Sequence, residues 1–198
     1  MLNSRVLNYP LTQFRFCSPG EGAAAVIVAR ADKAHLSTDK PILIRGVTVR
    51  SRRFGSFEVF SPWVAGETAD SPTVDASRAV YEMAGIGPDD IDVAQIQDSE
   101  AGAEIMHMAE NGFCKDGEQE ALIQAGETEI GGRMPINTDG GLIANGEPIG
   151  ASGMRQIYET VLQLRGDAGQ RQVPGNPRVG YTQVYGAPGI GACTILSR

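Results

Sequence analysis

The 198-residue sequence has little of what membrane proteins and secreted proteins need. No apolar run approaches the roughly 18 residues that span a bilayer, and the first residues carry no apolar signal-peptide core. Cysteine is scarce: Cys17, Cys114 and Cys193 are odd in number and widely spaced. This pattern excludes a disulfide framework and predicts free thiols in a reducing cytoplasm.

Basic residues are also few, since 17 Lys and Arg stand against 24 Asp and Glu, a formal net charge of −7. A nucleic-acid surface is excluded because it needs a concentrated basic field.

Aromatic residues make up only 6% of an otherwise globular composition with 41% hydrophobic and 21% charged residues. Glycine is abundant, with 25 of 198 residues, against an average of about 7%. It indicates tight turns and close backbone approaches.

Strand-like and helix-like segments alternate from residue 42 onward. Strands are expected at residues 41–50, 93–97, 179–185 and 192–196, and helices are expected to begin at Ser71, Ala101 and Ser152 and to end at Gly85, Gly112 and Gly166. The order β-α-β-α-β-β predicts an α/β fold with a mixed, mostly parallel sheet covered by helices.

The run of small apolar residues at 22–29 has the length and composition of a strand buried on both faces. Nothing before it supplies neighbouring strands, so we interpret it as the tail of a domain whose beginning is missing. An unpaired apolar edge of this kind predicts self-association or pairing with a partner protein.

Residue spacing assigns faces to two of the predicted helices. The helix that begins at Ser152 places four apolar residues on one buried face: Met154, Ile157, Val161 and Leu164. The helix that begins at Ala101 has a polar stripe: Glu100, Glu104, His107 and Asn111. Glu104 and His107 have a spacing that suits metal binding, but the chain has only two histidines and no second such pair. We therefore predict a solvated helix face and no metal site.

Ligands of open α/β sheets bind at the carboxyl ends of strands, where residues 97–100, 145–148 and 185–189 are polar or rich in glycine. In the first stretch, Asp98 or Ser99 fits a helix N-cap and Glu100 fits the first-turn dipole. Residues 140–153 hold five glycines and lead into a helix, so their N–H groups are expected to face a ligand. No Gly-Lys-Ser/Thr follows, which excludes a phosphate loop.

Several ordered motifs resemble the C-terminal half of a thiolase. They are Asn137-Thr-Asp-Gly-Gly141, Gly146-Glu-Pro-Ile-Gly-Ala-Ser-Gly153 and Gly189-Ile-Gly-Ala-Cys-Thr-Ile-Leu196. Residues 7–11 and 164–169 are most similar to the lipid-transfer-protein or sterol-carrier branch of the superfamily. The resemblance covers essentially the whole chain.

This resemblance implies a fold of two similar βαβαββ halves whose sheets sandwich helices. Residues 1–32 would be the tail of an absent N-terminal domain, and residues 40–198 would be the C-terminal domain. The family's nucleophilic cysteine belongs to the first half, so this chain is expected to lack thiolase activity by itself.

The catalytic positions implied by the resemblance have changed residue type. Glu147 stands where the family has the histidine of Gly-His-Pro, and Tyr185 aligns best with the second catalytic cysteine. Gln97 and Asp98 occupy the Asn/His-Glu/Asp motif, where the Gln97 amide could hold a water in an oxyanion hole. Cys193 is predicted to be buried in the last strand. The resemblance assigns substrate binding to Asn137, Gly146, Ser152 and Gly189, and we expect Glu147 and Tyr185 to approach each other.

The leading functional hypothesis is half of an acyl-CoA acyltransferase of lipid or steroid catabolism, acting on the C–C bond next to a coenzyme A thioester, which is substrate and not cofactor. One alternative is a retro-aldolase of the thiolase fold that cleaves steroid side-chain thioesters with tyrosines. Another is a domain that binds acyl-CoA or a partner without catalysis. The resemblance offers three partners: a second copy, a chain with the N-terminal half, or a small zinc-binding OB-fold protein.

Overall fold

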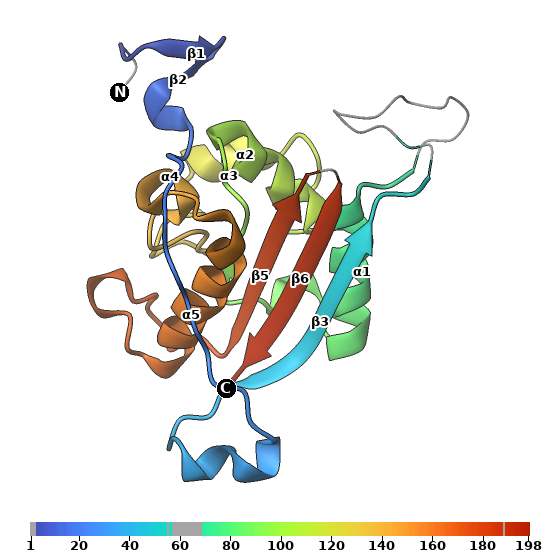
Figure 1. Cartoon of the computed structure of the whole chain (residues 1–198), viewed down its shortest axis with the longest axis vertical. Helices are drawn as coiled ribbons and strands as arrows, with labels where there is room; N and C mark the ends of the chain where they lie inside the picture. Colours follow the sequence, from blue (N-terminus) through green and yellow to red (C-terminus); the bar gives the residue numbers. More distant parts are fainter. Residues whose placement is uncertain (1–2, 55, 57–68, 188) are drawn as a thin grey trace.

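The computed structural model describes residues 3–54, 56, 69–187 and 189–198. Its centre is a four-stranded sheet in the order β3-β6-β5-β4 (Figure 1). β3 (Leu43–Ser51) and β5 (Val179–Gly186) each pair antiparallel with β6 (Ile190–Ser197), and β4 (Val93–Gln95) pairs parallel with β5. Three strands therefore run in one direction and β6 opposes them, which confirms the predicted α/β class with a mixed sheet.

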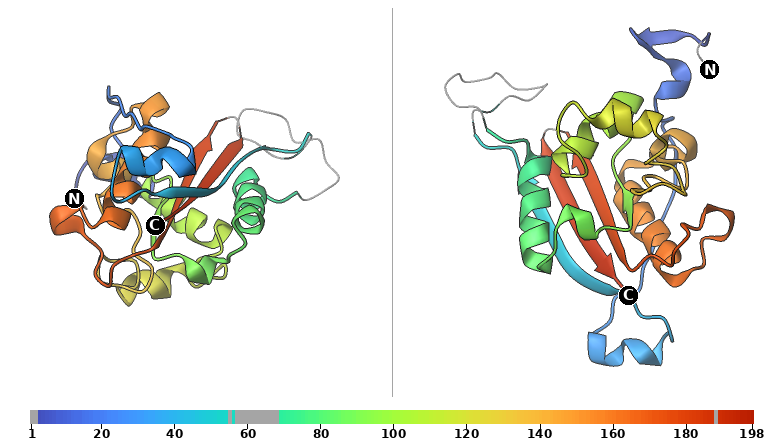
Figure 2. Two further views of the ribbon diagram at one scale, coloured as in Figure 1. Left: turned by 90° about the horizontal axis from the view of Figure 1, so that it is seen from below. Right: turned by 180° about the vertical axis from the view of Figure 1, so that it is seen from behind.

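One face of the sheet is covered by α1 (Pro72–Ala84) and α2 (Ala101–Glu110), which Figure 2 shows from behind. α1 begins and ends as its sequence predicts, because the Ser71 hydroxyl accepts a hydrogen bond from the Val74 N–H at 3.3 Å and Gly85 is left-handed with φ +69°. The core lies between these helices and the strands. At its centre the fully buried Tyr181 ring stacks on Tyr81, with ring centroids 5.5 Å apart.

The opposite face is covered only in part, by α5 (Ser152–Arg165), which packs against β4 and β5. The approach is close, since a Cβ on Gly180 would lie 2.3 Å from Thr160 Cγ2. The prediction that this helix buries an apolar face is wrong in part. Leu164 is buried, but the other side chains facing inward are polar: Ser152, Gln156, Glu159, Thr160 and Gln163. The loop after the helix supplies partners for two of them, since the Val173 N–H donates to Gln163 Oε1 at 2.9 Å and Arg171 Nη2 donates to Glu159 Oε2 at 2.9 Å.

The rest of that face is open, and no helix lies in front of β3 and β6 in Figure 1. Gly46 and Thr48 of β3 face α1, so the alternating Val47 and Val49 point to the open side. These two valines are 50% and 59% exposed.

Residues 22–29 do not form the predicted strand. They run as an extended segment past α5, with Ile27 93% and Val28 70% exposed (Figure 1). A strand needs a neighbouring ladder, and the described part of the chain provides none beside this segment.

The remaining elements are small. β1 (Val6–Asn8) and β2 (Leu11–Thr12) form an N-terminal hairpin, and α3 (Gln119–Gln124) and α4 (Gly141–Asn145) lie in the connection between α2 and α5. Short 3₁₀ turns occur at Gln13–Arg15, Ala31–Leu36, Pro88–Asp90, Ile149–Ala151 and Gly169–Arg171. Among the helices that the structure describes, none has both the length and the apolarity to cross a membrane.

Candidate functional site

The predicted site stretches meet at the carboxyl ends of β4 and β5. Gln97 follows β4 and its backbone N–H donates to Gln183 Oε1 on β5 at 2.9 Å. Tyr185 lies near the end of β5, at the same edge, because β4 and β5 are parallel. Glu147 reaches this edge from the glycine-rich stretch between α4 and α5.

Glu147 is the centre of a cluster of three side chains. The Gln97 amide donates to Glu147 Oε1 at 2.7 Å, and the Cys17 thiol donates to Glu147 Oε2 at 3.4 Å. Gly146, with φ +79°, makes the turn that directs the chain here, and a Cβ on it would lie 3.1 Å from the Ser18 carbonyl oxygen. The half-buried Glu147 carboxylate is therefore held at both of its oxygens.

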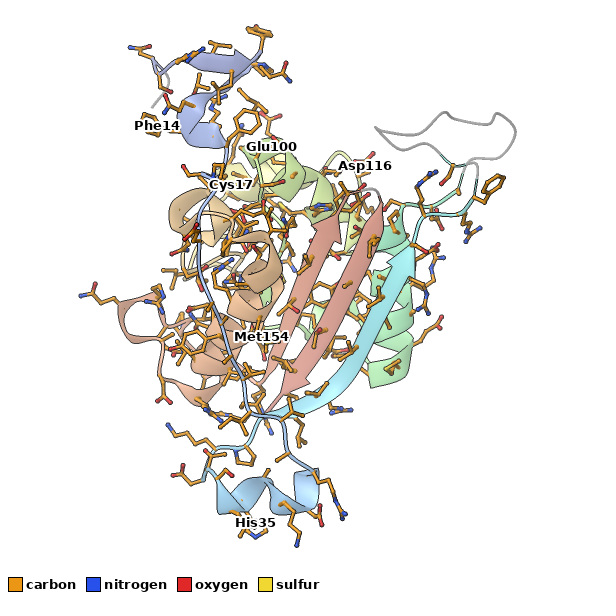
Figure 3. The ribbon with its side chains drawn as sticks, viewed as in Figure 1. Phe14, Cys17, His35, Glu100, Asp116 and Met154 are labelled. Carbon is orange, nitrogen blue, oxygen red and sulfur yellow. The ribbon has the colours of Figure 1, made fainter. Side chains whose placement is uncertain are left out.

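Cys17 belongs to this cluster although nothing in its sequence neighbourhood indicates it. It lies 130 positions from Glu147 in the chain, and Figure 3 places it beside Glu100 at one end of the sheet. Burial, followed by the hydrogen bond and charge of Glu147 and a smaller effect of Asp98, raises the pKa of the Cys17 thiol to about 11. The thiol is therefore protonated at neutral pH.

Asp98 is a helix cap, but of a different helix from the one predicted. Its carboxylate accepts from the backbone N–H groups of Leu142 at 2.7 Å and Ile143 at 3.2 Å, at the start of α4. α2 is capped instead by Glu100, whose Oε2 accepts from the Gly102 N–H at 2.7 Å. The local sequence pattern correctly predicted that Asp98 caps a helix. The helix that it caps, α4, lies more than 40 residues further along the chain and not directly after Asp98.

Burial raises the pKa of the Asp98 carboxyl from about 3.8 to about 7, against the opposing effect of its two backbone hydrogen bonds. The folded state then holds this proton more tightly than the unfolded state does. The stability that Asp98 contributes is present below pH 4 and is lost as pH rises through 7.

Between pH 4 and pH 7 we expect the free energy of unfolding to fall by up to about 1.4 kcal/mol per pH unit, because the unfolded state releases the Asp98 proton and the folded state keeps it. Urea unfolding at pH 5 and 7.5 measures the fall, and Asp98→Asn should flatten it. An equal pH dependence in both proteins would contradict the assignment.

The glycine-rich stretch uses its first N–H groups within the protein. The Gly141 N–H donates to Asp139 Oδ1 at 3.1 Å, and the next two donate to Asp98. The expectation that these N–H groups face a ligand is therefore wrong for the start of α4, because two carboxylates of the chain already occupy it.

The four residues predicted to bind substrate lie in different settings. Asn137 is buried, its Oδ1 accepting from the Ile96 N–H at 3.0 Å and its Nδ2 donating to Glu104 Oε2 at 2.7 Å. Ser152 is the fully buried first residue of α5. Gly189, with φ +95°, turns the chain between β5 and β6, and Gly146 precedes Glu147. Their roles toward a substrate stay predictions.

The polar stripe of α2 is buried at His107 and Asn111 and partly buried at Glu100 and Glu104, so the prediction of a solvated face is wrong. His107 is 1% exposed and Asn111 is fully buried. His107 Nδ1 lies 2.6 Å from Glu110 Oε2, and the His107 ring centroid lies 5.9 Å from that of Tyr185. The helix buries His107 and Asn111 together with Met108, and the buried Tyr181 hydroxyl donates to Asn111 Oδ1 at 2.6 Å. The described residues contain no group of three or more His, Cys, Asp or Glu side chains arranged to hold a metal ion.

Cys193 is buried in β6, as predicted, where its sulfur accepts a hydrogen bond from the Tyr181 hydroxyl at 3.0 Å. Glu147 is connected with Gln97 and Cys17, and Tyr185 with His107. That Glu147 and Tyr185 act in one shared site stays a prediction.

A mixed sheet with a polar cluster at the carboxyl ends of its parallel strands is the architecture expected of a thiolase half. Residues 65–198 match the family model described as thiolase C-terminal domain-like. The chain therefore belongs to the thiolase family, and the resemblance seen in its motifs is confirmed.

The chain also resembles individual members of known function. It is 37% identical over 200 residues to the acetyl-CoA acetyltransferase of Methanothermobacter thermautotrophicus, covering 100% of this chain and 50% of that protein. It is 34% identical over 197 residues to sterol carrier protein 2 of Rattus norvegicus, covering 98% of this chain and 36% of that protein. Among solved structures, an "Ltp2-ChsH2(DUF35) aldolase" matches with a TM-score of 0.79 and 27% identity, over 98% of this chain and 49% of that one. The chain thus spans half or less of the length of these relatives.

Proposed function

We propose that this chain is the C-terminal half of an acyl-CoA enzyme of lipid or steroid catabolism that makes or breaks the C–C bond next to a coenzyme A thioester. The observation that carries the proposal is Glu147, held by Gln97 and Cys17 at the carboxyl ends of the parallel strands. Claisen condensation and thiolysis both need a proton taken from, or returned to, carbon or sulfur. A carboxylate fixed in position at this edge of the sheet can accept or return that proton.

The surrounding residues take supporting roles in this proposal. Gln97 orients the carboxylate through its amide nitrogen, while Asp98 keeps α4 and the glycine-rich stretch in place. Gly146 makes the turn that brings Glu147 to this edge, and Gly189 turns the chain between β5 and β6. Asn137 holds the segment after β4 through the Ile96 N–H, and the buried Ser152 hydroxyl, which has no partner among the described residues, is the candidate for a polar contact with the thioester. The nucleophile comes from the half that this chain lacks, and coenzyme A is part of the substrate.

The second candidate is a retro-aldolase that acts on steroid side-chain thioesters. It is favoured by Tyr185, whose ring contacts the buried His107, which is itself held by Glu110. In such a cleavage a base removes the proton of the β-hydroxyl group, the Cα–Cβ bond breaks, and the thioester enolate regains a proton at carbon. Tyr185 would exchange that proton. The similarity to a solved aldolase is consistent with this alternative.

We further propose that residues 1–32 close the missing N-terminal domain and that residues 40–198 are the C-terminal domain. The open face of the sheet, with Val47 and Val49 in water, and the exposed apolar segment at 22–29 are the surfaces that the other half would cover. A thiolase N-terminal half is the first partner to test. A second copy and a small zinc-binding OB-fold protein are the others, and the free thiols support a cytoplasmic setting.

The experiment compares the purified chain with the chain co-expressed with the N-terminal half of the Methanothermobacter relative. We expect no turnover of acetoacetyl-CoA by the chain alone and turnover by the co-purified pair, with light scattering reporting the complex. Cleavage of a 3-hydroxyacyl thioester instead would favour the retro-aldolase. Binding of both partner and acyl-CoA without turnover would leave a non-catalytic binding domain. Turnover by the chain alone that a cysteine-to-alanine change abolishes would refute the proposal.

A further inference from the structure

The stretch at residues 17–19 reaches Glu147 from far away in the sequence. The Cys17 N–H donates to the Ser99 carbonyl oxygen at 2.9 Å, and the Glu147 N–H donates to the Ser18 carbonyl oxygen at 2.9 Å. Pro19 and Glu147 form a parallel β-bridge. This stretch is therefore fixed on both sides, between the segment that follows β4 and the segment that follows α4.

The fixed backbone places the Cys17 thiol against the Glu147 carboxylate. A cysteine in this position could act as a nucleophile only as a thiolate. Burial and the neighbouring carboxylates raise the pKa of the thiol to about 11, so the sulfur keeps its proton at neutral pH. A protonated thiol beside a carboxylate acts as a hydrogen-bond donor.

Gln97 supplies the second donor and leaves an acceptor unused. Its Nε2 donates to Glu147 Oε1 at 2.7 Å. Gln97 is only 4% exposed, and its Oε1 has no hydrogen-bond partner among the residues that the structure describes. A buried carbonyl without a partner is costly, and the bond that Gln97 donates to Glu147 offsets that cost in this orientation of the amide.

We propose that Cys17 is a positioning residue for Glu147, holding one carboxylate oxygen with its thiol while Gln97 holds the other. Two fixed donors limit the carboxylate to one orientation, with the remaining lone pairs directed to the substrate. The proposal rests on the proposed role of Glu147 as the group that accepts the proton. It adds that the site of the C-terminal domain is completed by residues 17–19, which precede that domain.

Thiol alkylation tests the contact without any need for activity. The full chain with Cys114→Ser is treated with iodoacetamide at pH 8, and mass spectrometry follows the tryptic peptide of residues 16–30, which carries Cys17. Glu147→Gln removes the charge and the carboxylate acceptor, which lowers the pKa of the thiol. We expect alkylation about tenfold faster than in the parent, as one pKa unit gives ten times more thiolate.

Glu82→Gln is the matched control, because it removes the same charge from an exposed position on α1. It should leave the alkylation rate of Cys17 unchanged. Thermal unfolding followed by circular dichroism identifies any variant that alkylates faster only because it is less stable. Equal rates in Glu147→Gln and Glu82→Gln would overturn the proposal and leave the proposed function standing.

Kinetics of the assembled enzyme provide the second test. Cys17→Ala should lower kcat at least tenfold with little change in KM, since the substrate is still bound but Glu147 is misplaced. Cys17→Ser restores a donor at the same position and should recover most of the lost kcat. If the serine variant is as slow as the alanine variant, the sulfur itself is required and the positioning role is wrong. If the assembled parent is inactive while alkylation responds to Glu147→Gln, the proposed function fails and the contact stands.

Discussion

Replacement of Glu147 by glutamine is expected to lower kcat of the assembled enzyme by about 10²- to 10⁴-fold, the usual contribution of a positioned acid or base. Glutamine keeps the size of the side chain and can still accept the hydrogen bond that Gln97 donates. It cannot take a proton at neutral pH. The loss should therefore appear in kcat, with KM and complex formation nearly unchanged.

Two variants make this result specific to the Glu147 site. Glu147→Asp keeps the charge but withdraws the carboxylate by one methylene, and should be intermediate between parent and glutamine. Glu82→Gln changes the same net charge at an exposed position and should keep the parent kcat. A loss of less than tenfold in Glu147→Gln would assign the proton transfer to another group, with Tyr185 the first to test.

Gly141→Ala is expected to be the most destabilising small substitution in the glycine-rich stretch. Gly141 has φ +60°, a conformation that costs an L residue roughly 1–2 kcal/mol. The added Cβ would also lie 2.1 Å from Asp98 Oδ2. Asp98 would have to move and release the N–H groups of Leu142 and Ile143, at roughly 1–3 kcal/mol for each buried group left unpaired. We expect a total loss of at least about 3 kcal/mol in the free energy of unfolding, the sum of the lower limits of these costs.

Gly150→Ala is the matched control for this prediction. Gly150 lies in the same stretch, is exposed, and a Cβ added there would meet no atom within 4 Å. Its stability should stay within about 0.5 kcal/mol of the parent, as for most surface substitutions. Urea unfolding of the three proteins at pH 6 provides the comparison. Near-equal midpoints for Gly141→Ala and Gly150→Ala would show that Asp98 and α4 adjust without cost.

Features decided by neighbouring residues were predictable from the sequence. The start of α1 is an example, because Ser71 and Val74 make the capping bond within four residues. The strands β5 and β6 are another, since both are rich in β-branched or aromatic residues and pair with each other across a short turn. The thiolase motifs also located the edge of the sheet where Gln97 and Glu147 meet.

Features decided by partners far away in the chain were not predictable in the same way. Residues 22–29 have the composition of a strand but no ladder to join in the described structure. His107 looked like a surface residue because the Tyr185 ring beside it lies on β5 and is found only once α2 is placed on the sheet. Cys17 joins the site through a contact across 130 positions. No local pattern encodes such contacts.

The exposed valines of β3, Val47 and Val49, limit the amount of this chain that a cell can accumulate. An apolar face in water, next to an edge strand, is the kind of surface by which unassembled proteins aggregate and are recognised by chaperones and proteases. Arg45 and Arg50 place charge on that edge and oppose pairing with other strands, but they do not cover Val47 and Val49. In the proposed assembly with an N-terminal half, any of this chain made in excess of that partner would keep the valines in water and add no active complex. The supply of the proposed partner would then set the amount that persists.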